Sequence, residues 1–167
     1  PMSTDEALLT GQVVLLGYGR VGRRITRTLR EQGVAHVVVD HNRERIEDLR
    51  EQGAAAVCGD AATAEVLVQA HIARAAMLIV AIPDVVDVRR VVEIARLLNP
   101  KIALVLRTHS EDEAELLCAE NLGAVFMGEH ELARGMSEYV LAFMRGTASE
   151  RQGAPAAEPP AAGRTSH

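Results

Sequence analysis

The stretch VVLLGYGRVGRRITRTLREQGVAHVVVDHN, from Val13 to Asn42, decides the fold. It begins with an apolar run and passes through a turn that contains three glycines. An amphipathic segment follows, with Val21, Ile25 and Leu29 at spacings of four, and a second apolar run ends on an acid. This order predicts a strand, a tight turn, a helix and a second strand, which together form one unit of a parallel sheet.

The same alternation continues along most of the chain. Apolar runs predict strands at 13–16, 34–39, 54–57, 76–82, 102–106 and 124–127. Helical patterns follow the first glycine turn and then cover 43–52, 64–70, 85–98, a segment between a Ser110/Glu113 capping box and Gly123, and 131–144. Six strands alternating with helices predict an α/β fold with a doubly wound parallel sheet, Rossmann-like, in strand order 3-2-1-4-5-6.

Composition changes mark the ends of this domain. Residues 1–11 are polar and mixed and are interpreted as a linker. Residues 12–146 form the predicted Rossmann-like domain. Residues 147–167 are rich in Ala, Pro and Gly without a large apolar side chain, so a disordered tail is expected there.

Charge and residue usage exclude several classes of protein. The 167 residues carry 18 basic and 23 acidic side chains, a net charge of −5, which argues against nucleic acid as a partner. The one basic concentration is Arg20, Arg23, Arg24, Arg27 and Arg30. Two distant cysteines and six histidines without paired spacing predict neither a disulfide framework nor a metal site. No apolar run is long enough to cross a bilayer.

The glycine turn is the first candidate binding site. Gly17, Gly19 and Gly22 match G-x-G-x-x-G between a predicted strand and a predicted helix. In that context the first glycine permits the turn, the second lets pyrophosphate approach the backbone and the third allows close packing. The N–H groups of the helix would face the phosphates, and Arg20 could pair with one of them. A purely structural turn is the alternative.

Acids at the ends of the next two strands extend this site. Asp40 lies 21 residues beyond Gly19, where a carboxylate accepts the ribose hydroxyls and repels a 2′-phosphate. It could also cap the following helix, and Arg43 and Arg45 keep a 2′-phosphate open. Asp60, after the third strand, either meets the adenine side of a ligand or caps the next short helix.

Two further features remain open at this point. Arg107 ends the fifth strand and could contact phosphate, a second small ligand or a partner subunit, or could simply be solvated. The apolar side chains of the last helix either cover the sheet or form a dimer contact.

Residues that catalyse hydride transfer are not evident. A carbonyl reaction needs a proton donor and a substrate pocket, and the sequence has no Tyr-x-x-x-Lys pair. The sole lysine, Lys101, lies at the wrong end of the fifth predicted strand. We therefore expect no catalytic residues and no enzyme activity, because a nucleotide-binding fold alone does not confer it.

Four motifs together resemble a known family. They are VVLLGYGRVGRRI, VVVDHNRERIEDLREQGAAAVCGDAA, MLIVAIPD and IALVLRTHS. The combination resembles the TrkA-N or RCK regulatory domain, most of all the C-terminal domain of Kef-type and YbaL-like potassium (cation):proton antiporters. The resemblance implies phosphate contacts around the glycine turn, ribose contacts at Asp40 and adenine contacts at Asp60. The full set of expected contact residues is Gly17, Tyr18, Gly19, Arg20, Val21, Gly22, Asp40, His41, Asn42, Asp60, Ala61 and Arg107.

The resemblance also implies a function. It predicts a regulatory domain that senses NAD(H), AMP or ATP and gates a cation:proton antiporter. A homodimer is expected, with a membrane domain upstream of Pro1 in the same chain, at the cytoplasmic face of a bacterial inner membrane. Glutathione-gated members often end the fifth strand on Arg-x-Arg, whereas this chain has Arg107-Thr108-His109, so glutathione control is not expected. The alternatives are an NAD-dependent oxidoreductase fragment and a free Trk-type channel-regulating subunit.

Overall fold

The computed structural model describes residues 10–82 and 88–151, which divide into two compact units after Met127. The strands of the first unit are β1 (Val13–Leu16), β2 (His36–Asp40), β3 (Ala56–Cys58), β4 (Met77–Val80), β5 (Ala103–Thr108) and β6 (Ala124–Met127). Its helices are α1 (Arg20–Glu31), α2 (Arg43–Glu51), α3 (Ala64–Gln69), the 3-10 turn η2 (Ile72–Arg74), α4 (Val88–Leu98) and α5 (Glu111–Ala119). The second unit contains α6 (Gly128–Arg151).

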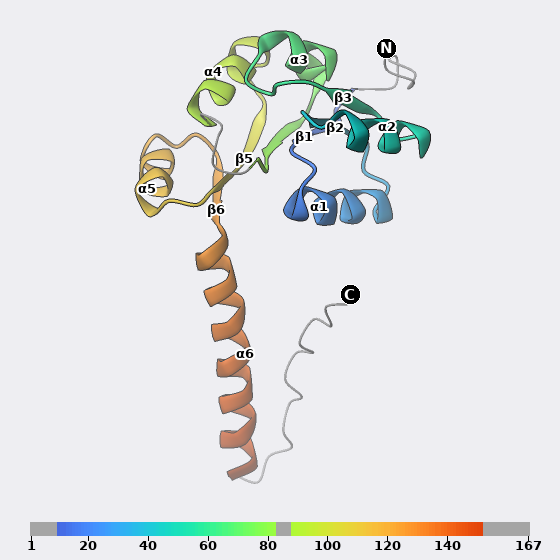
Figure 1. Cartoon of the computed structure of the whole chain (residues 1–167). Helices are drawn as coiled ribbons and strands as arrows, with labels where there is room; N and C mark the ends of the chain where they lie inside the picture. Colours follow the sequence, from blue (N-terminus) through green and yellow to red (C-terminus); the bar gives the residue numbers. More distant parts are fainter. Residues whose placement is uncertain (1–9, 83–87, 152–167) are drawn as a thin grey trace. The chain divides into compact units, whose positions relative to one another are not determined.

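The six strands form one parallel sheet in the order β3-β2-β1-β4-β5-β6, as the sequence predicts (Figure 1). In the central pairs Leu16 is in register with Val39 of β2 and with Val80 of β4. The chain therefore reverses its direction of winding between β1 and β4. In such sheets ligands bind where this reversal opens a crevice at the carboxyl ends of the strands.

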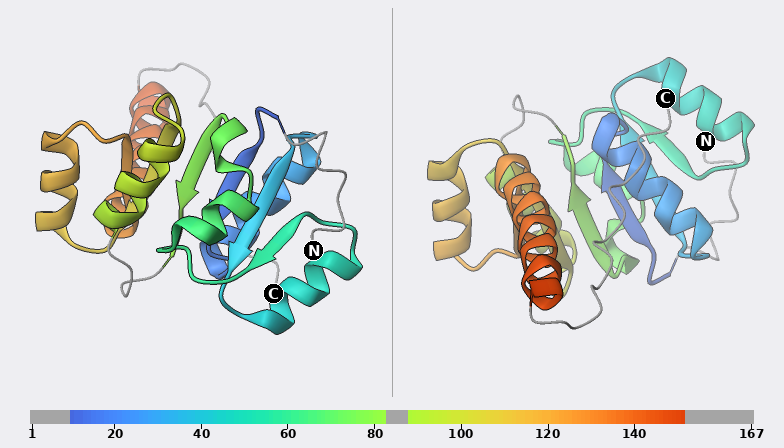
Figure 2. Two further views of the ribbon diagram at one scale, coloured as in Figure 1. Left: turned by 90° about the horizontal axis from the view of Figure 1, so that it is seen from above. Right: turned by 90° about the horizontal axis from the view of Figure 1, so that it is seen from below.

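Two apolar clusters hold helices to opposite faces of the sheet. Because side chains alternate along a strand, Val13 and Leu15 pack toward α1 and α2, whereas Val14 and Leu16 pack toward α3, α4 and α5. Figure 2 shows α3 in front of the sheet in one view and α1 in front of it in the other. The central strands are buried on both faces, which explains their continuous apolar runs.

Most expected element bounds agree with the structure to within a few residues. The strand predicted at 34–39 lies at His36–Asp40, and the strand predicted at 102–106 extends to Thr108. The predicted capping box is half realised, because Ser110 Oγ accepts from Glu113 N–H at 3.3 Å while Ser110 N–H donates to Thr108 Oγ1. The helix that follows ends at Ala119, before the predicted stop at Gly123.

Helix α6 is longer than the expected 131–144. It begins at Gly128 and continues to Arg151, past Gly146 and into the segment expected to be a disordered tail. Side chains support this continuation, since Thr147 Oγ1 donates to the Met144 carbonyl at 3.0 Å. The rest of that tail, 152–167, lies outside the described residues, as do linker residues 1–9 and the predicted start of α4 at 85–87.

The side chains of α6 differ in polarity from one face of the helix to the other. Exposed apolar side chains recur on one face at Leu132, Met136, Tyr139, Val140 and Phe143, and two more, Leu141 and Met144, are exposed outside that face. The opposite face carries Arg134, whose guanidinium contacts Glu131 at 2.6 Å and Glu138 at 3.0 Å. These two carboxylates raise the pKa of Arg134 above its ordinary value. Among the described helices none combines the length and apolarity that a bilayer span needs.

Candidate functional site

The glycine turn connects the carboxyl end of β1 to α1. Gly17 N–H donates to the Val39 carbonyl at 2.8 Å, which ties the turn to β2. Gly17 has φ +101°, and a Cβ at this position would lie 3.0 Å from the carbonyl oxygen of Ala81. A side chain is therefore disfavoured both by the backbone conformation and by the end of β4.

Gly22 and Gly19 differ sharply in their surroundings. A Cβ on Gly22 would overlap the carbonyl oxygen of Gly17, because the first turn of α1 packs directly on the turn backbone. A Cβ on Gly19 would meet nothing within 4 Å. The backbone at Gly19 thus borders open space, which is where a pyrophosphate would approach according to the expected role of the second glycine.

The N-terminus of α1 is left open for an anion. Gly19 is its N-cap and offers no side-chain acceptor, and the first turn contains no acidic residue. By contrast, Asn42 Oδ1 caps α2 at Arg45 N–H, and Ser110 Oγ caps α5. The unpaired N–H groups and the helix dipole at an uncapped N-terminus favour a negative charge.

Asp40 is the best-connected polar group of the site. Its side chain is only 4% exposed. Oδ2 accepts from Tyr18 N–H at 2.8 Å, and Oδ1 accepts from Asn42 N–H at 2.8 Å. The carboxylate therefore joins the glycine turn to the start of α2. Each oxygen still has a lone pair with which it can accept a further hydrogen bond.

Two basic side chains flank this carboxylate on the α2 side. Arg45 Nη1 lies 3.9 Å from Asp40 Oδ2, and His41 Nδ1 lies 3.7 Å from Oδ1. The His41 side chain is 83% exposed, whereas Asn42 serves as the N-cap of α2. Asp40 therefore does not cap α2 itself; Asn42 does, and Asp40 fixes the backbone of Asn42.

The loop after β3 lies beside Asp40. Asp40 is in register with Cys58, and Gly59 N–H donates to the Asp40 carbonyl at 3.1 Å. Asp60 is exposed and forms its own turn, because Oδ1 accepts from Ala62 N–H at 2.9 Å. Of the two roles left open for Asp60, the cap of α3 is excluded, since Thr63 occupies the N-cap position. Ala61 is buried in the core that α3 and α4 share with the sheet.

Arg107 lies farther from this group. It is half-buried near the end of β5, in register with Phe126 of β6. Two strands separate it from β2, and neighbouring strands are about 4.8 Å apart. The structure thus brings together the glycine turn, the Asp40 region and the Asp60 loop at one sheet edge, with Arg107 to one side.

Sequence reasoning missed the contribution of the two residues that directly follow β4. The backbone of Ala81 and the side chain of Ile82 contact the position that a Cβ on Gly17 would fill. These residues therefore shape the turn from the other side of the strand-order reversal. The strand order itself is the signal that identifies them, because β4 follows β1 at the crevice.

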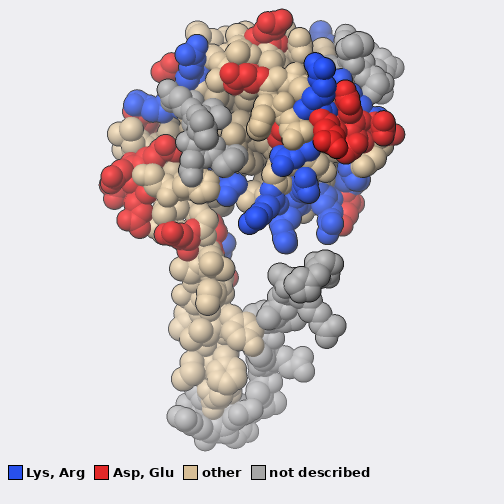
Figure 3. Space-filling model, in the orientation of Figure 1, with Lys and Arg blue, Asp and Glu red and all other residues tan. Residues whose placement is uncertain are grey.

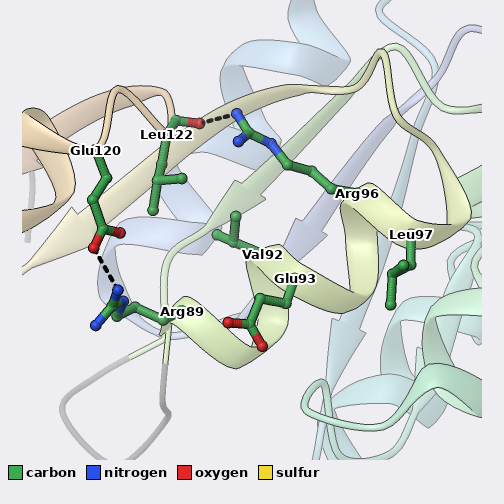
Figure 4. Close-up of a pocket in the computed structure, with 7 residues that line it drawn as sticks. All are labelled: Arg89, Val92, Glu93, Arg96, Leu97, Glu120 and Leu122. Atoms are coloured by element: carbon green, nitrogen blue, oxygen red, sulfur yellow. Dashed lines mark hydrogen bonds and ion pairs between the residues drawn. The ribbon is translucent and has the colours of Figure 1, made fainter.

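A hollow in the first unit is lined by none of these residues. It has a volume of about 460 Å³ and lies between α4 and the turn from α5 to β6 (Figure 4). Its two arginines are already engaged, Arg89 with the Glu120 carboxylate and Arg96 with the Leu122 carbonyl at 2.9 Å. Within the described residues, no group of His, Cys, Asp and Glu is arranged to hold a metal ion.

Comparison with known sequences identifies relatives of the first unit. The model of the TrkA-N domain matches residues 13–127. The putative cation/proton antiporter YbaL of Escherichia coli K12 is 37% identical over 130 residues, which is 78% of this chain and 23% of YbaL. Glutathione-regulated potassium-efflux protein KefC of Cronobacter sakazakii is 34% identical over 101 residues, 60% of this chain and 16% of KefC. The chain thus spans about a quarter or less of these relatives.

Solved structures share the fold. The TrkA-N domain of E. coli YbaL aligns with TM-score 0.74 and 37% identity over 78% of this chain and 97% of that one. The Kef C-terminal domain of Shewanella denitrificans, solved with AMP, aligns with TM-score 0.68 and 25% identity over 85% and 87%. The GsuK channel bound to NAD aligns with TM-score 0.60 and 26% identity over 71% and 21%.

The sequence match and the fold agree on one assignment. The family model covers β1 to β6, and it includes the glycine turn, Asp40 and Asp60. The resemblance drawn from the four sequence motifs is therefore confirmed: the chain belongs to the TrkA-N domain family, with relatives among YbaL and Kef-type antiporters.

Proposed function

We propose that this chain is a regulatory domain that binds an adenine nucleotide at the glycine turn and controls a cation:proton antiporter. The observation that carries the proposal is the open, uncapped N-terminus of α1 beside Gly19, with the Asp40 carboxylate at the adjacent strand end. An anion-binding helix end next to a hydroxyl acceptor matches the two polar parts of a nucleotide, its phosphate and its ribose.

Each part of the site takes one part of the ligand. Backbone N–H groups of Arg20, Val21 and Gly22 and the Arg20 guanidinium would hold phosphate, with the Tyr18 and Gly17 backbone shaping the turn. Asp40 would accept the ribose hydroxyls, with His41 and Asn42 beside it. The Asp60–Ala61 loop would border adenine, and Arg107 would reach a more distant group of the ligand.

Regulation would follow because one bound ligand contacts both the glycine turn and the start of α2. Asp40 already connects the glycine turn to α2, so ligand contacts at both places would favour one arrangement of these elements. A differential affinity of about 1–3 kcal/mol between two arrangements is enough for useful control. The antiporter domain would lie upstream in the same chain, with this domain, residues 12–146, at the cytoplasmic face of a bacterial inner membrane.

Ligand selectivity tests the proposal. We expect NADH, NAD, AMP and ATP each to raise the thermal unfolding midpoint of the full chain, because a ligand that binds only the folded state stabilises it. NADP should give a clearly smaller shift, since its 2′-phosphate would face the Asp40 carboxylate. Differential scanning fluorimetry across a ligand concentration series measures both effects.

One outcome with NADP would contradict this selectivity. An NADP shift equal to or larger than the NADH shift would mean that Arg45, 3.9 Å from Asp40, accommodates the 2′-phosphate instead. Glutathione serves as a ligand outside the proposal and should give no shift. Absence of a shift with every adenine ligand would contradict nucleotide sensing itself.

The proposal assigns no catalytic step to this chain. Among the described residues, Asp40 and Asp60 accept from backbone N–H groups near the turn, and neither is placed as the donor that a carbonyl substrate requires. NADH should therefore not be oxidised when the chain is mixed with a panel of small carbonyl compounds. Turnover that disappears on Gly19→Ala would support the oxidoreductase alternative.

Two exposed apolar surfaces support a homodimer. In the first unit, α1 and α2 cover the β1–β3 part of one sheet face, while Ala103, Ala124 and Phe126 on β5 and β6 are exposed. In the second unit, the apolar face of α6 is exposed along its length. Burial of both surfaces on association of two copies would stabilise a dimer.

A glutamate introduced on the apolar face of α6 tests whether this face takes part in dimer formation. We expect the wild-type chain to have twice the mass of one chain in size-exclusion chromatography with light scattering. Met136→Glu, in the middle of the apolar face, should shift it to monomer because the carboxylate would be buried. Ser137→Glu adds the same charge off that face and should leave the dimer intact; two variants with equal masses would contradict the role of this face.

A further inference from the structure

Helix α1 presents an arginine stripe, formed by Arg20, Arg23, Arg24, Arg27 and Arg30. With 100° of rotation for each residue, the five positions lie within an arc of about 120° and along about 15 Å of the helix. All five side chains are exposed, and Glu31 is the sole acid on α1. Figure 3 shows the basic side chains gathered over this helix, in a chain whose net charge is −5.

The fold does not use this stripe. Within residues 10–82 and 88–151, none of the five guanidinium groups forms an ion pair with an acid, and Arg23 lies over the Tyr18 ring at 5.5 Å from its centroid. Like charges three and four residues apart repel each other along the helix. Packing of α1 comes instead from Val21, Ile25 and Leu29 on the opposite side. Among the described residues, no ion pair with an acid therefore offsets the repulsion within the stripe.

We propose that the arginine stripe docks on the anionic phospholipid headgroups of a membrane surface. Guanidinium groups bind phosphate oxygens in a bidentate manner and are weakly hydrated, which suits them to headgroups. An anionic surface attracts each basic residue near it and does so over a flat area. This inference rests on the proposed function, which places a membrane beside the domain.

The surroundings of the stripe favour headgroups over an acidic protein. Protein interfaces draw most of their affinity from buried aromatic or apolar anchors at their centre. No large apolar side chain is exposed on α1, so the stripe offers charge alone. The same absence means that the helix would rest on the headgroups without inserting into the hydrocarbon.

The test separates lipid docking from nucleotide binding. The triple variant Arg24→Gln/Arg27→Gln/Arg30→Gln removes the three arginines farther along α1 and leaves Arg20, Arg23 and the glycine turn unchanged. The control Arg74→Gln/Lys101→Gln/Arg145→Gln removes the same charge from exposed positions elsewhere. Cosedimentation at low salt uses vesicles of phosphatidylcholine alone and vesicles that contain one third phosphatidylglycerol.

We expect the wild-type chain and the control to bind the phosphatidylglycerol vesicles and to be released by higher salt. The triple variant should bind about 100-fold more weakly, from about 5-fold for each arginine. Equal binding of the triple variant and the control, or no preference for phosphatidylglycerol, would overturn the proposal. Lack of vesicle binding by the wild-type chain would also overturn it. An acidic polypeptide would then be the alternative partner of the stripe.

The thermal shift with AMP distinguishes a failure of lipid docking from a failure of nucleotide sensing. The triple variant should retain the thermal shift with AMP, because its turn is intact. An intact AMP shift together with failed vesicle binding refutes lipid docking alone. A wild-type chain that binds vesicles but gives no thermal shift with any nucleotide refutes nucleotide sensing. The vesicle result for the stripe then stands independently.

Discussion

Gly22→Ala is expected to lower the free energy of unfolding by about 3 kcal/mol, at the upper end of what overpacking costs. The added methyl would overlap the Gly17 carbonyl oxygen, a backbone atom that cannot rotate away. Either the turn or the first turn of α1 must shift. On an open helix the same substitution would instead stabilise by about 1 kcal/mol. Chemical denaturation with circular dichroism measures the difference.

Gly19→Ala is the matched control for this prediction. Gly19 lies three residues away in the same motif, has φ −86° and has open space where its Cβ would be. Its stability should fall by less than about 1 kcal/mol, the difference between Gly and Ala at an N-cap. Equal losses for the two variants would contradict the assignment of close packing to Gly22.

Asp40→Ala should reduce both stability and nucleotide affinity. The substitution leaves Tyr18 N–H and Asn42 N–H without their acceptor, at about 1–3 kcal/mol for each group that becomes buried and unpaired. It also removes the proposed ribose acceptor, for which we expect about 10- to 100-fold weaker binding of NADH. Denaturation and equilibrium titration measure the two effects separately.

Two further variants define the Asp40 effect. Asp40→Asn keeps one carbonyl oxygen and replaces the other with a donor, so only one of the two backbone N–H groups retains an acceptor. Its stability should fall between that of the wild type and that of Asp40→Ala. Asp48→Asn on α2 makes the same charge change at an exposed position and should match the wild type. If Asp48→Asn lowered stability as much as Asp40→Asn does, the loss of stability would be due to net charge and not to the hydrogen bonds.

The fold was predictable because its local signals agree. The apolar run at Val13, the turn at Gly17 and the alternation that follows all indicate a parallel sheet, and a right-handed connection rule then sets the order of strands. The strand at 124–127 was predicted with its observed bounds because Gly123 precedes it and a change of pattern follows it. Burial on both faces explains why the central strands were clear.

Other features depend on contacts that a sequence does not display. The cap of α3 stays open at the level of sequence, because Asp60 and Thr63 are both good cap residues and the geometry of the loop decides between them. The pattern predicts too short a helix for α6 because the composition changes after Gly146, although a single glycine in a helix costs only about 1 kcal/mol.

The site was predictable in outline but not in its connections. The positions of Gly19 and Asp40 follow from motif spacing, whereas the bond from Tyr18 N–H to Asp40 joins residues 22 apart in sequence. That bond gives Asp40 a role that motif spacing does not predict, because the carboxylate also holds the backbone of the glycine turn. The roles of Ala81 and Ile82 likewise appear only when β4 is placed beside β1.

Calorimetric titration of AMP into the full chain, wild type and Gly19→Ala, tests the central claim most directly. The account predicts saturable binding of one AMP for each wild-type chain, and at least about tenfold weaker binding by Gly19→Ala with a stability loss below about 1 kcal/mol, because its methyl group occupies the space expected for phosphate. Absence of saturable binding to the wild type, or equal affinity of the two chains, would contradict nucleotide binding at the glycine turn.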